Sequence, residues 1–151
     1  MSHAYARNHL HIIFGTKGRR ASIKPPVQEN LWAYIRGIAR NYKMDLEAIG
    51  GTDNHVHLLI ALPPKLSLAD AIRAIKANSS KWMNENGHLF AWQEGYAAFS
   101  VSASLLGMVT EYIHNQPEHH KRRTFEQEFP ALLKKHGIVA IPPKCSDRCR
   151  P

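Results

Sequence analysis

The first clear pattern along the chain is an alternation of side-chain types over positions 9–16. A period of two places neighbouring side chains on opposite faces of an extended backbone, so this segment predicts a β-strand. The two faces differ in kind, because one is entirely apolar and the other carries two histidines. The apolar face consists of Leu10, Ile12 and Phe14, and the opposite face of His9, His11 and Ile13.

Two longer segments, 27–42 and 67–86, repeat apolar residues at spacings of three and four, which predicts two amphipathic helices. Ser67 stands three residues before Asp70, as in a capping box at the start of a helix. Gly87 suits the position that follows the last helical residue.

A β-hairpin is predicted between these helices. Residues 44–50 and 55–62 are short apolar segments, and only the tight connection 52–54 separates them. Two prolines follow the second segment and would end it. The remaining predicted elements are extended segments at 90–93 and 97–101, a helix over 102–116, and a last helix with Pro130 in its first turn that ends before Gly137.

The order of these elements is β-α-β-β-α-β, followed by appended helices. It predicts the α+β class, with a ferredoxin-like core (βαββαβ), an antiparallel sheet with helices on one face, and extra C-terminal helices. No segment resembles a linker, so residues 1–138 are expected to form a single domain. Residues 139–151 contain prolines and no periodicity, which predicts a tail. Cys145 and Cys149 lie in this tail and are too few for a disulfide framework or a complete zinc site.

The charge of the chain narrows the classes of function. Twenty lysines and arginines outnumber twelve aspartates and glutamates, which gives a net charge of +8. Such a balance is typical of proteins that bind polyanions, nucleic acid first and an acidic membrane surface second, although a protein can also be basic for no such reason. No apolar run approaches the roughly 20 residues of a membrane span, and the N-terminal segment has no apolar signal core. We therefore expect a cytoplasmic protein with no membrane partner.

Two motifs contain residues that could bind a metal ion or take part in catalysis. His55 and His57 open a predicted strand and share one of its faces, so their imidazoles can converge on one cation or satisfy each other with ordinary hydrogen bonds. Tyr112 and Gln116 stand four apart on a predicted helix and share a face. Beside a divalent ion the tyrosine hydroxyl could attack phosphorus, whereas the simpler interpretation is a core tyrosine and a solvated glutamine.

Cations form three groups, which together favour a track for phosphates over three unrelated solvated faces. Trp92, Tyr96 and Phe99 are candidates to stack on unpaired bases, although core packing is the expected role of Phe99. The candidate DNA-binding cations are Lys17, Arg19 and Arg20, then Arg73 and Lys76, and finally Lys121, Arg122 and Arg123.

The motif His55-Val56-His57, followed by Tyr112-Ile113-His114-Asn115-Gln116, resembles the single-tyrosine HUH (His-hydrophobic-His) transposases of the IS200-like family. That family includes insertion-sequence transposases and REP-associated tyrosine transposases. The resemblance extends over about residues 9–138, through segments such as HLHIIFGTKGRR and IGGTDNHVHLLIAL. The pair of histidines alone is a weak signal, but the pair followed by the Tyr-x-x-x-Gln spacing is a strong one.

The resemblance implies a DNA transposase that cuts and rejoins single-stranded DNA, recognised partly through hairpins. It implies that His55, His57 and Gln116 bind Mg²⁺ or Mn²⁺, and that Tyr112 is the nucleophile of a 5′-phosphotyrosine intermediate. It further implies a homodimer through sheet edges with trans active sites, in which Tyr112 of one subunit serves the histidines of the other. The short segment 100–104, rich in small residues, would allow such a crossing.

Three alternatives stay open at this point. A non-enzymatic binder of single-stranded nucleic acid would need the cations and aromatic residues but not Tyr112. A metal-dependent hydrolase would need further carboxylate or histidine ligands, for which Asp53 is the nearest candidate. The Tyr-x-x-x-Gln motif argues against both. The third alternative is a domesticated relative that acts on repetitive palindromes. The sequence does not distinguish such a protein from a mobile-element enzyme.

Overall fold

The computed structural model describes residues 5–139. Its sheet has four antiparallel strands in the order β2-β3-β1-β4. The strands are β1 (His9–Gly15), β2 (Asp45–Gly51), β3 (His55–Ala61) and β4 (Ala97–Val101). The predicted hairpin is the β2–β3 pair, and the α+β class with a ferredoxin-like order of elements is confirmed.

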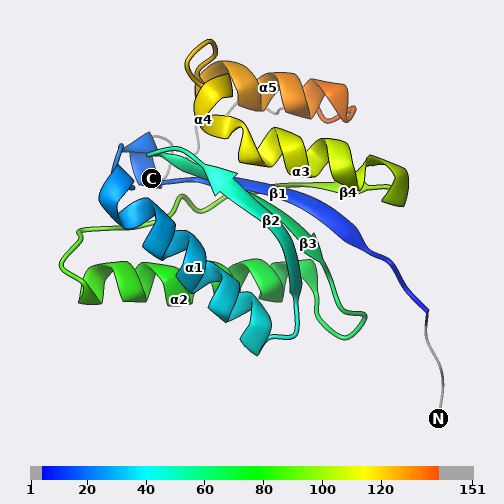
Figure 1. Ribbon diagram of the computed structural model, residues 1–151, viewed down its shortest axis with the longest axis horizontal. Helices are drawn as coiled ribbons and strands as arrows, with labels where there is room; N and C mark the ends of the chain where they lie inside the picture. Colours follow the sequence, from blue (N-terminus) through cyan, green and yellow to red (C-terminus); the bar gives the residue numbers. More distant parts are fainter. Residues whose placement is uncertain (1–4, 140–151) are drawn as a thin grey trace, which may run out of the picture.

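One face of the sheet is covered by α1 (Pro25–Asn41) and α2 (Leu68–Glu85), as Figure 1 shows. Both helices are amphipathic, and their apolar sides pack with one face of the strands into the largest apolar cluster of the described chain. Two prolines begin α1, and the Ser67 hydroxyl accepts a hydrogen bond from the Asp70 amide at the start of α2, as predicted.

The other face is covered by α3 (Leu106–His114), α4 (Gln116–His119) and α5 (Phe125–Lys135) (Figure 1). These helices bury only two small apolar clusters against the strands. One cluster lies around Ile13 and Phe125, and the other around Leu59 and Ile113. Polar side chains fill the space between the two clusters.

The C-terminal helices correct the sequence predictions in two places. The helix predicted over 102–116 is a short 3-10 turn (Ala103–Leu105) followed by α3, and it stops at His114. Pro117 explains the break, because it lacks the amide hydrogen that would bond to the carbonyl of Ile113 and its ring crowds that carbonyl. The last helix begins at Phe125 and not near Pro130, because Thr124 and Gln127 form a capping box ahead of it and Pro130 lies inside the helix.

The predicted extended segment at 90–93 does not add a strand to the sheet. It makes one isolated bridge, between Thr16 and Trp92. A second 3-10 turn, η1 (Lys17–Arg19), precedes it in the chain and follows β1 directly. No helix within residues 5–139 has the length and apolar character to cross a membrane. Cys145, Cys149 and most of the predicted tail lie outside the described residues.

Gly50 on β2 determines how closely α3 approaches the sheet. A Cβ atom at this position would lie 2.2 Å from the carbonyl oxygen of Ile113, a distance that real Cβ atoms do not show. Only glycine therefore lets the backbone of α3 rest directly on the strand. Because Tyr112 precedes Ile113, this contact sets the position of Tyr112 relative to the neighbouring strand β3.

Candidate metal and nucleic-acid site

His55 and His57 open β3 and are both fully buried. The Nδ1 atom of His55 lies 2.8 Å from Asn54 Oδ1 and 3.0 Å from Thr52 Oγ1. The Nδ1 atom of His57 lies 2.8 Å from His11 Nε2 on the neighbouring strand β1. Each ring is therefore oriented through Nδ1, which leaves the two Nε2 atoms to face the same space.

Gln116 joins this pair although the predicted helix is interrupted. Its side chain is fully buried, and its Oε1 lies 3.1 Å from His55 Nε2. Its amide nitrogen donates to the backbone oxygen of Tyr112 at 3.4 Å, which orients the amide oxygen toward the histidines. The structure thus brings His55, His57 and Gln116 close together, and their role as metal ligands stays a prediction.

Tyr112 lies at the edge of the same cluster, with its ring centroid 5.8 Å from that of His57. Its hydroxyl donates a hydrogen bond to Oε2 of Glu128, with an O···O distance of 2.5 Å. The tyrosine and both histidines belong to one chain in this arrangement. A trans site, with Tyr112 supplied by a second subunit, stays a prediction that a single chain does not test.

Sequence reasoning missed three members of the cluster: His11, His120 and Glu128. Glu128 is buried, and its Oε1 lies 3.0 Å from His57 Nε2 and 3.8 Å from His55 Nε2. The ligand atoms of Glu128, His120 and the histidine pair all lie within 4.8 Å of one another. One signal was available, because His9-Leu10-His11 is a second His-hydrophobic-His segment on the adjacent strand. Nothing in the local pattern singled out Glu128, which comes from α5.

Burial dominates the electrostatics of the cluster. It lowers the pKa of His11 and that of His55 to about 3 each, with the neighbouring His57 as the second cause. Burial also lowers the pKa of His57, so these imidazoles are neutral at pH 7. For the Tyr112 hydroxyl, burial and then the Glu128 carboxylate raise the pKa, which favours the protonated phenol. Burial alone would raise the pKa of Glu128, but contacts from imidazoles and from Tyr112 hold it well below its usual range.

These protonation states fit a shared divalent cation. Because Asn54 Oδ1 is an acceptor, neutral His55 donates to it from Nδ1 and keeps a lone pair on Nε2. That lone pair faces the amide oxygen of Gln116 across 3.1 Å, so two acceptors face each other without a proton between them. Ligands of an ion bound at about 2.1 Å lie about 3 Å apart when they are at right angles. The donor set and its spacing therefore suit a metal ion.

Comparison with known proteins places the chain in a family. Residues 4–116, which include both the histidine pair and the Tyr-x-x-x-Gln spacing, match the family described as Transposase IS200 like. The chain belongs to the IS200-like transposases. The match ends at Gln116, so α5 and Glu128 lie beyond the matched segment.

Relatives of this transposase agree with the fold and the family. It is 25% identical over 116 residues to the ISDra2 transposase TnpA of Deinococcus radiodurans, covering 70% of this chain and 81% of that protein. A crystal structure assigned as a transposase from Deinococcus radiodurans R1 superposes with a TM-score of 0.62 at 25% identity, covering 77% of this chain and 96% of the other. A REP-associated tyrosine transposase bound to a REP hairpin superposes with a TM-score of 0.61 at 17% identity, covering 80% and 73%.

A cavity of about 510 Å³ adjoins Tyr112 in this transposase. It lies between α3, β4 and α5, and its lining includes Val109, Tyr112 and Leu132. His11 and His119 also reach its wall, so the cavity connects the histidine cluster with the surface. The Tyr112 side chain is therefore accessible from this side.

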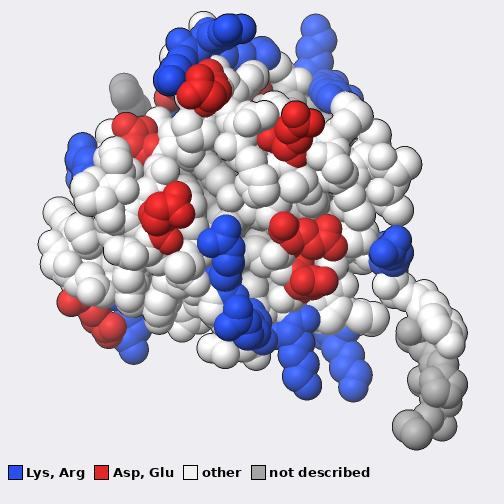
Figure 2. All heavy atoms as spheres, viewed as in Figure 1, with Lys and Arg blue, Asp and Glu red and all other residues white. Residues whose placement is uncertain are grey.

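The candidate DNA-binding cations do not form a single track. Two of the three groups meet at the start of α5, where Arg19 pairs with Glu126 at 3.2 Å and Arg123 donates to the backbone oxygen of Gln127. Figure 2 shows lysine and arginine side chains over the turn between α4 and α5, at the top of the view. All six cations of the two groups are exposed, and Lys121 pairs with Glu118.

The third group, Arg73 and Lys76, lies on α2, across the sheet from the histidines. Arg73 pairs with Asp70 at 2.8 Å. The Lys76 ammonium donates to three backbone oxygens of the 93–95 loop, at 2.8, 3.1 and 2.9 Å. Lys76 thus holds this loop against α2, a structural role that accounts for its partial burial.

The candidate stacking aromatics are mostly part of the core. Trp92 is buried against Phe14, and its indole nitrogen donates to Ser79 Oγ at 2.8 Å. Phe99 is buried and stacks on His136, as expected for a core residue. Tyr96 remains 40% exposed, and it alone of the three keeps an accessible ring.

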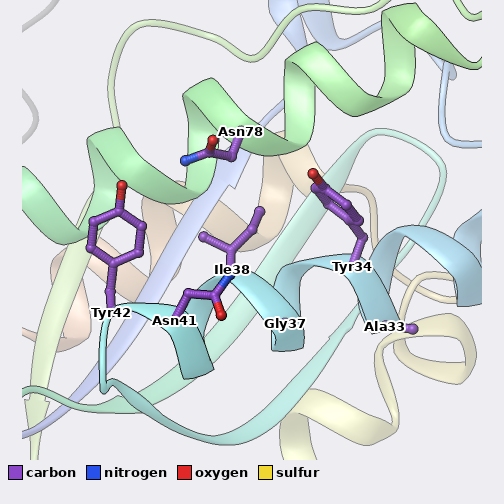
Figure 3. Close-up of a pocket in the computed structure, with 7 residues that line it drawn as sticks. All are labelled: Ala33, Tyr34, Gly37, Ile38, Asn41, Tyr42 and Asn78. Carbon is purple, nitrogen blue, oxygen red and sulfur yellow. The ribbon is translucent and has the colours of Figure 1, made fainter.

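A second cavity of about 540 Å³ lies between α1 and α2, far from the histidines. Tyr34 on α1 and Tyr42, just after the end of α1, flank it, and Asn78 reaches it from α2 (Figure 3). Its lining contains no histidine, carboxylate or cation, so it lacks the ligands of a metal site and the charges that would bind phosphate.

Proposed function

We propose that this transposase cuts and rejoins single-stranded DNA, with Tyr112 as the nucleophile and one divalent ion, Mg²⁺ or Mn²⁺, as cofactor. The observation that carries the proposal is the convergence of the Tyr112 hydroxyl with His55, His57 and Gln116 in one buried cluster, although these residues come from β3, α3 and α4. A core tyrosine and a solvated glutamine would not meet a histidine pair in this way.

The ion would be held by Nε2 of His55, Nε2 of His57 and Oε1 of Gln116. Bound there, it would neutralise charge on the scissile phosphate and make the phosphorus more electrophilic. Two imidazole nitrogens suit Mn²⁺ better than Mg²⁺, which prefers oxygen ligands.

The chain supplies the covalent step. The Tyr112 oxygen loses its proton and forms a bond to phosphorus, while the bond from phosphorus to the 3′-oxygen breaks and that oxygen takes up a proton. The product is a 5′-phosphotyrosine bond and a free 3′-hydroxyl. Because one phosphodiester replaces another, a second 3′-hydroxyl can reverse the reaction and join strands without ATP.

The DNA partner is supported by charge and by a relative. The exposed cations around the start of α5 lie on the same side of the sheet as Tyr112. The REP-associated transposase of the same fold was solved with a DNA hairpin. We therefore propose single-stranded DNA that contains a hairpin as the substrate.

A covalent-adduct assay tests the nucleophile. Tyr112→Phe removes one oxygen, and the adduct between protein and labelled single-stranded DNA should fall by at least about 10³-fold in Mn²⁺. Binding of the same DNA should persist. A metal-dependent hydrolase is the alternative that Glu128 favours, since it supplies the carboxylate that exposed Asp53 does not. Cutting that survives in the Phe variant would establish that alternative.

Subunit mixing tests the assembly. A homodimer with trans sites predicts that Tyr112→Phe protein and His57→Ala protein, each inactive alone, regain activity after subunits exchange. A mixture that stays inactive, with exchange verified by differently tagged subunits, would exclude the trans arrangement.

A further inference from the structure

We propose that Glu128 completes this site as a fourth metal ligand through Oε1, and that its Oε2 positions the Tyr112 hydroxyl. One carboxylate would then connect the cofactor with the nucleophile. The inference rests on the proposed function, since it requires that the histidine pair binds an ion.

The position of Oε1 supports its role as a ligand. It lies 3.0 Å from His57 Nε2 and 3.8 Å from His55 Nε2, which suits donors that share one ion. The cluster that contains it spans only 4.8 Å between ligand atoms. Glu128 would also add the one negative charge that the two imidazoles and the amide lack.

The burial of Glu128 points the same way. The side chain is 1% exposed, and a buried carboxylate is costly unless a cation or several donors accompany it. Within residues 5–139, the basic groups within 4.0 Å of it are all histidines. A divalent ion beside Oε1 would give this buried carboxylate a partner with full positive charge.

Oε2 faces the other way, toward the tyrosine. It accepts the hydrogen bond of the Tyr112 hydroxyl at 2.5 Å. His119 Nε2 lies 3.1 Å from the same oxygen, is buried and makes no hydrogen bond within the described chain. The carboxylate therefore holds the phenol oxygen at a fixed place beside the histidine pair.

The start of α5 is held in a position that directs the Glu128 carboxylate toward the histidine pair. The Thr124–Gln127 capping box fixes the first turn of the helix. Phe125 stacks on the ring of His55, with centroids 4.2 Å apart and planes 10° from parallel. Glu128 follows one turn later, so it faces the same strand.

The experiment measures Mn²⁺ affinity by calorimetry on the full chain, first without DNA. Glu128→Gln keeps the shape and removes the charge, and its affinity for Mn²⁺ should fall by about tenfold or more. Glu126→Gln is the matched control, because Glu126 is an exposed carboxylate on the same helix that pairs with Arg19. Its Mn²⁺ affinity should equal that of the wild type.

The outcomes separate the two proposals. Wild-type protein that binds Mn²⁺, with His57→Ala protein that does not, supports the metal site whatever Glu128 does. If Glu128→Gln then binds Mn²⁺ as tightly as the wild type, or more tightly, Glu128 is not a ligand, and tighter binding would show that it blocks the ion. Wild-type protein that binds no Mn²⁺ would overturn both proposals.

Two further variants keep the test independent of folding. Gln116→Glu combined with Glu128→Gln returns one carboxylate to the ligand set and should regain most of the lost affinity. Thermal unfolding in a chelator checks that each variant folds. If Glu128→Gln does not fold, Glu128→Asp is measured in its place. At saturating Mn²⁺, the rate of adduct formation should still be about tenfold lower in Glu128→Gln. An unchanged rate there would refute the positioning of Tyr112.

Discussion

On the α1–α2 face of the sheet, the central strands β1 and β3 present only apolar side chains, such as Ile12, Phe14 and Leu58. On the opposite face, the same two strands present His11, His55 and His57 between two small apolar clusters. Alternate residues of the same strands thus perform different tasks. The first face provides most of the apolar burial that stabilises the fold, and the second holds polar groups at defined distances.

The second face depends on the first. Burying neutral imidazoles and a carboxylate costs free energy unless each group has a partner, and small apolar clusters offset little of that cost. The large apolar cluster beneath the sheet is what permits such a face. Substitutions on the two faces should therefore separate stability from activity.

The largest expected effect is on the apolar face. Leu58 and Leu59 are adjacent and both fully buried, but they face opposite sides. Leu58→Ala should lower the free energy of unfolding by about 2–5 kcal/mol, measured by urea denaturation. Leu59→Ala should cost less stability and should lower adduct formation more, because Leu59 packs against Ile113 under α3. Equal losses of stability and activity in both variants would contradict the division of tasks.

The next effect is on the position of α3. Gly50→Ala places a methyl group against the Ile113 backbone and should displace Tyr112, which lowers the rate of adduct formation by about 10²-fold. Gly37→Ala is the control, because no atom lies within 4 Å of the added methyl group on α1. The control should gain about 0.5–1 kcal/mol of stability and keep full activity. Full activity in Gly50→Ala would mean that the close contact does not position the tyrosine.

A smaller effect concerns the stability of the folded protein at low pH. The pKa of His11 and that of His55 are lowered from 6.5 to about 3 in the folded protein. Below pH 6.5 the unfolded chain binds protons that the folded chain excludes, so stability is complete above that pH and falls as the pH drops toward 3. Each such histidine should lower the free energy of unfolding by about 1.4 kcal/mol for each pH unit within this window. Urea unfolding at pH 7.5 and 5.5, in a chelator, measures the loss.

Substitutions distinguish the contributions of single histidines to this acid sensitivity. His11→Asn should make the fall in stability with acid shallower than in the wild type. His114→Asn, at an exposed position on α3, is the control and should leave the slope as it is. A slope that is identical in all three proteins would show that His11 is not the source of the acid sensitivity.

The smallest effect concerns the two groups of cations. Arg122→Ala should weaken binding to single-stranded DNA a few-fold and reduce the slope of log affinity against log salt by about 0.7. Arg73→Ala, on the far face, should change neither quantity. Fluorescence anisotropy across a salt series tests both variants. A comparable loss in Arg73→Ala would place DNA on α2 as well.

Local patterns were sufficient for the strands and for the two long helices. Alternation predicted β1, and the three-and-four spacing predicted α1 and α2 to within a few residues. Spacing singled out residues 55, 57, 112 and 116, family resemblance supplied their expected roles, and the structure places them close together. Glu128 was missed because its role depends on how α5 returns to the sheet, which no local period encodes. The cations were grouped by sequence, and only the topology placed the α2 group across the sheet.

The cluster draws on residues that are far apart in order of synthesis, from His11 on β1 to Glu128 on α5. A ribosome therefore delivers the histidine pair first, then Tyr112, and the carboxylate last. On the proposed arrangement, a nascent chain that has already formed its sheet lacks the carboxylate that completes the centre. On that proposal, the tightest metal binding and the fastest DNA cutting would depend on completion of α5.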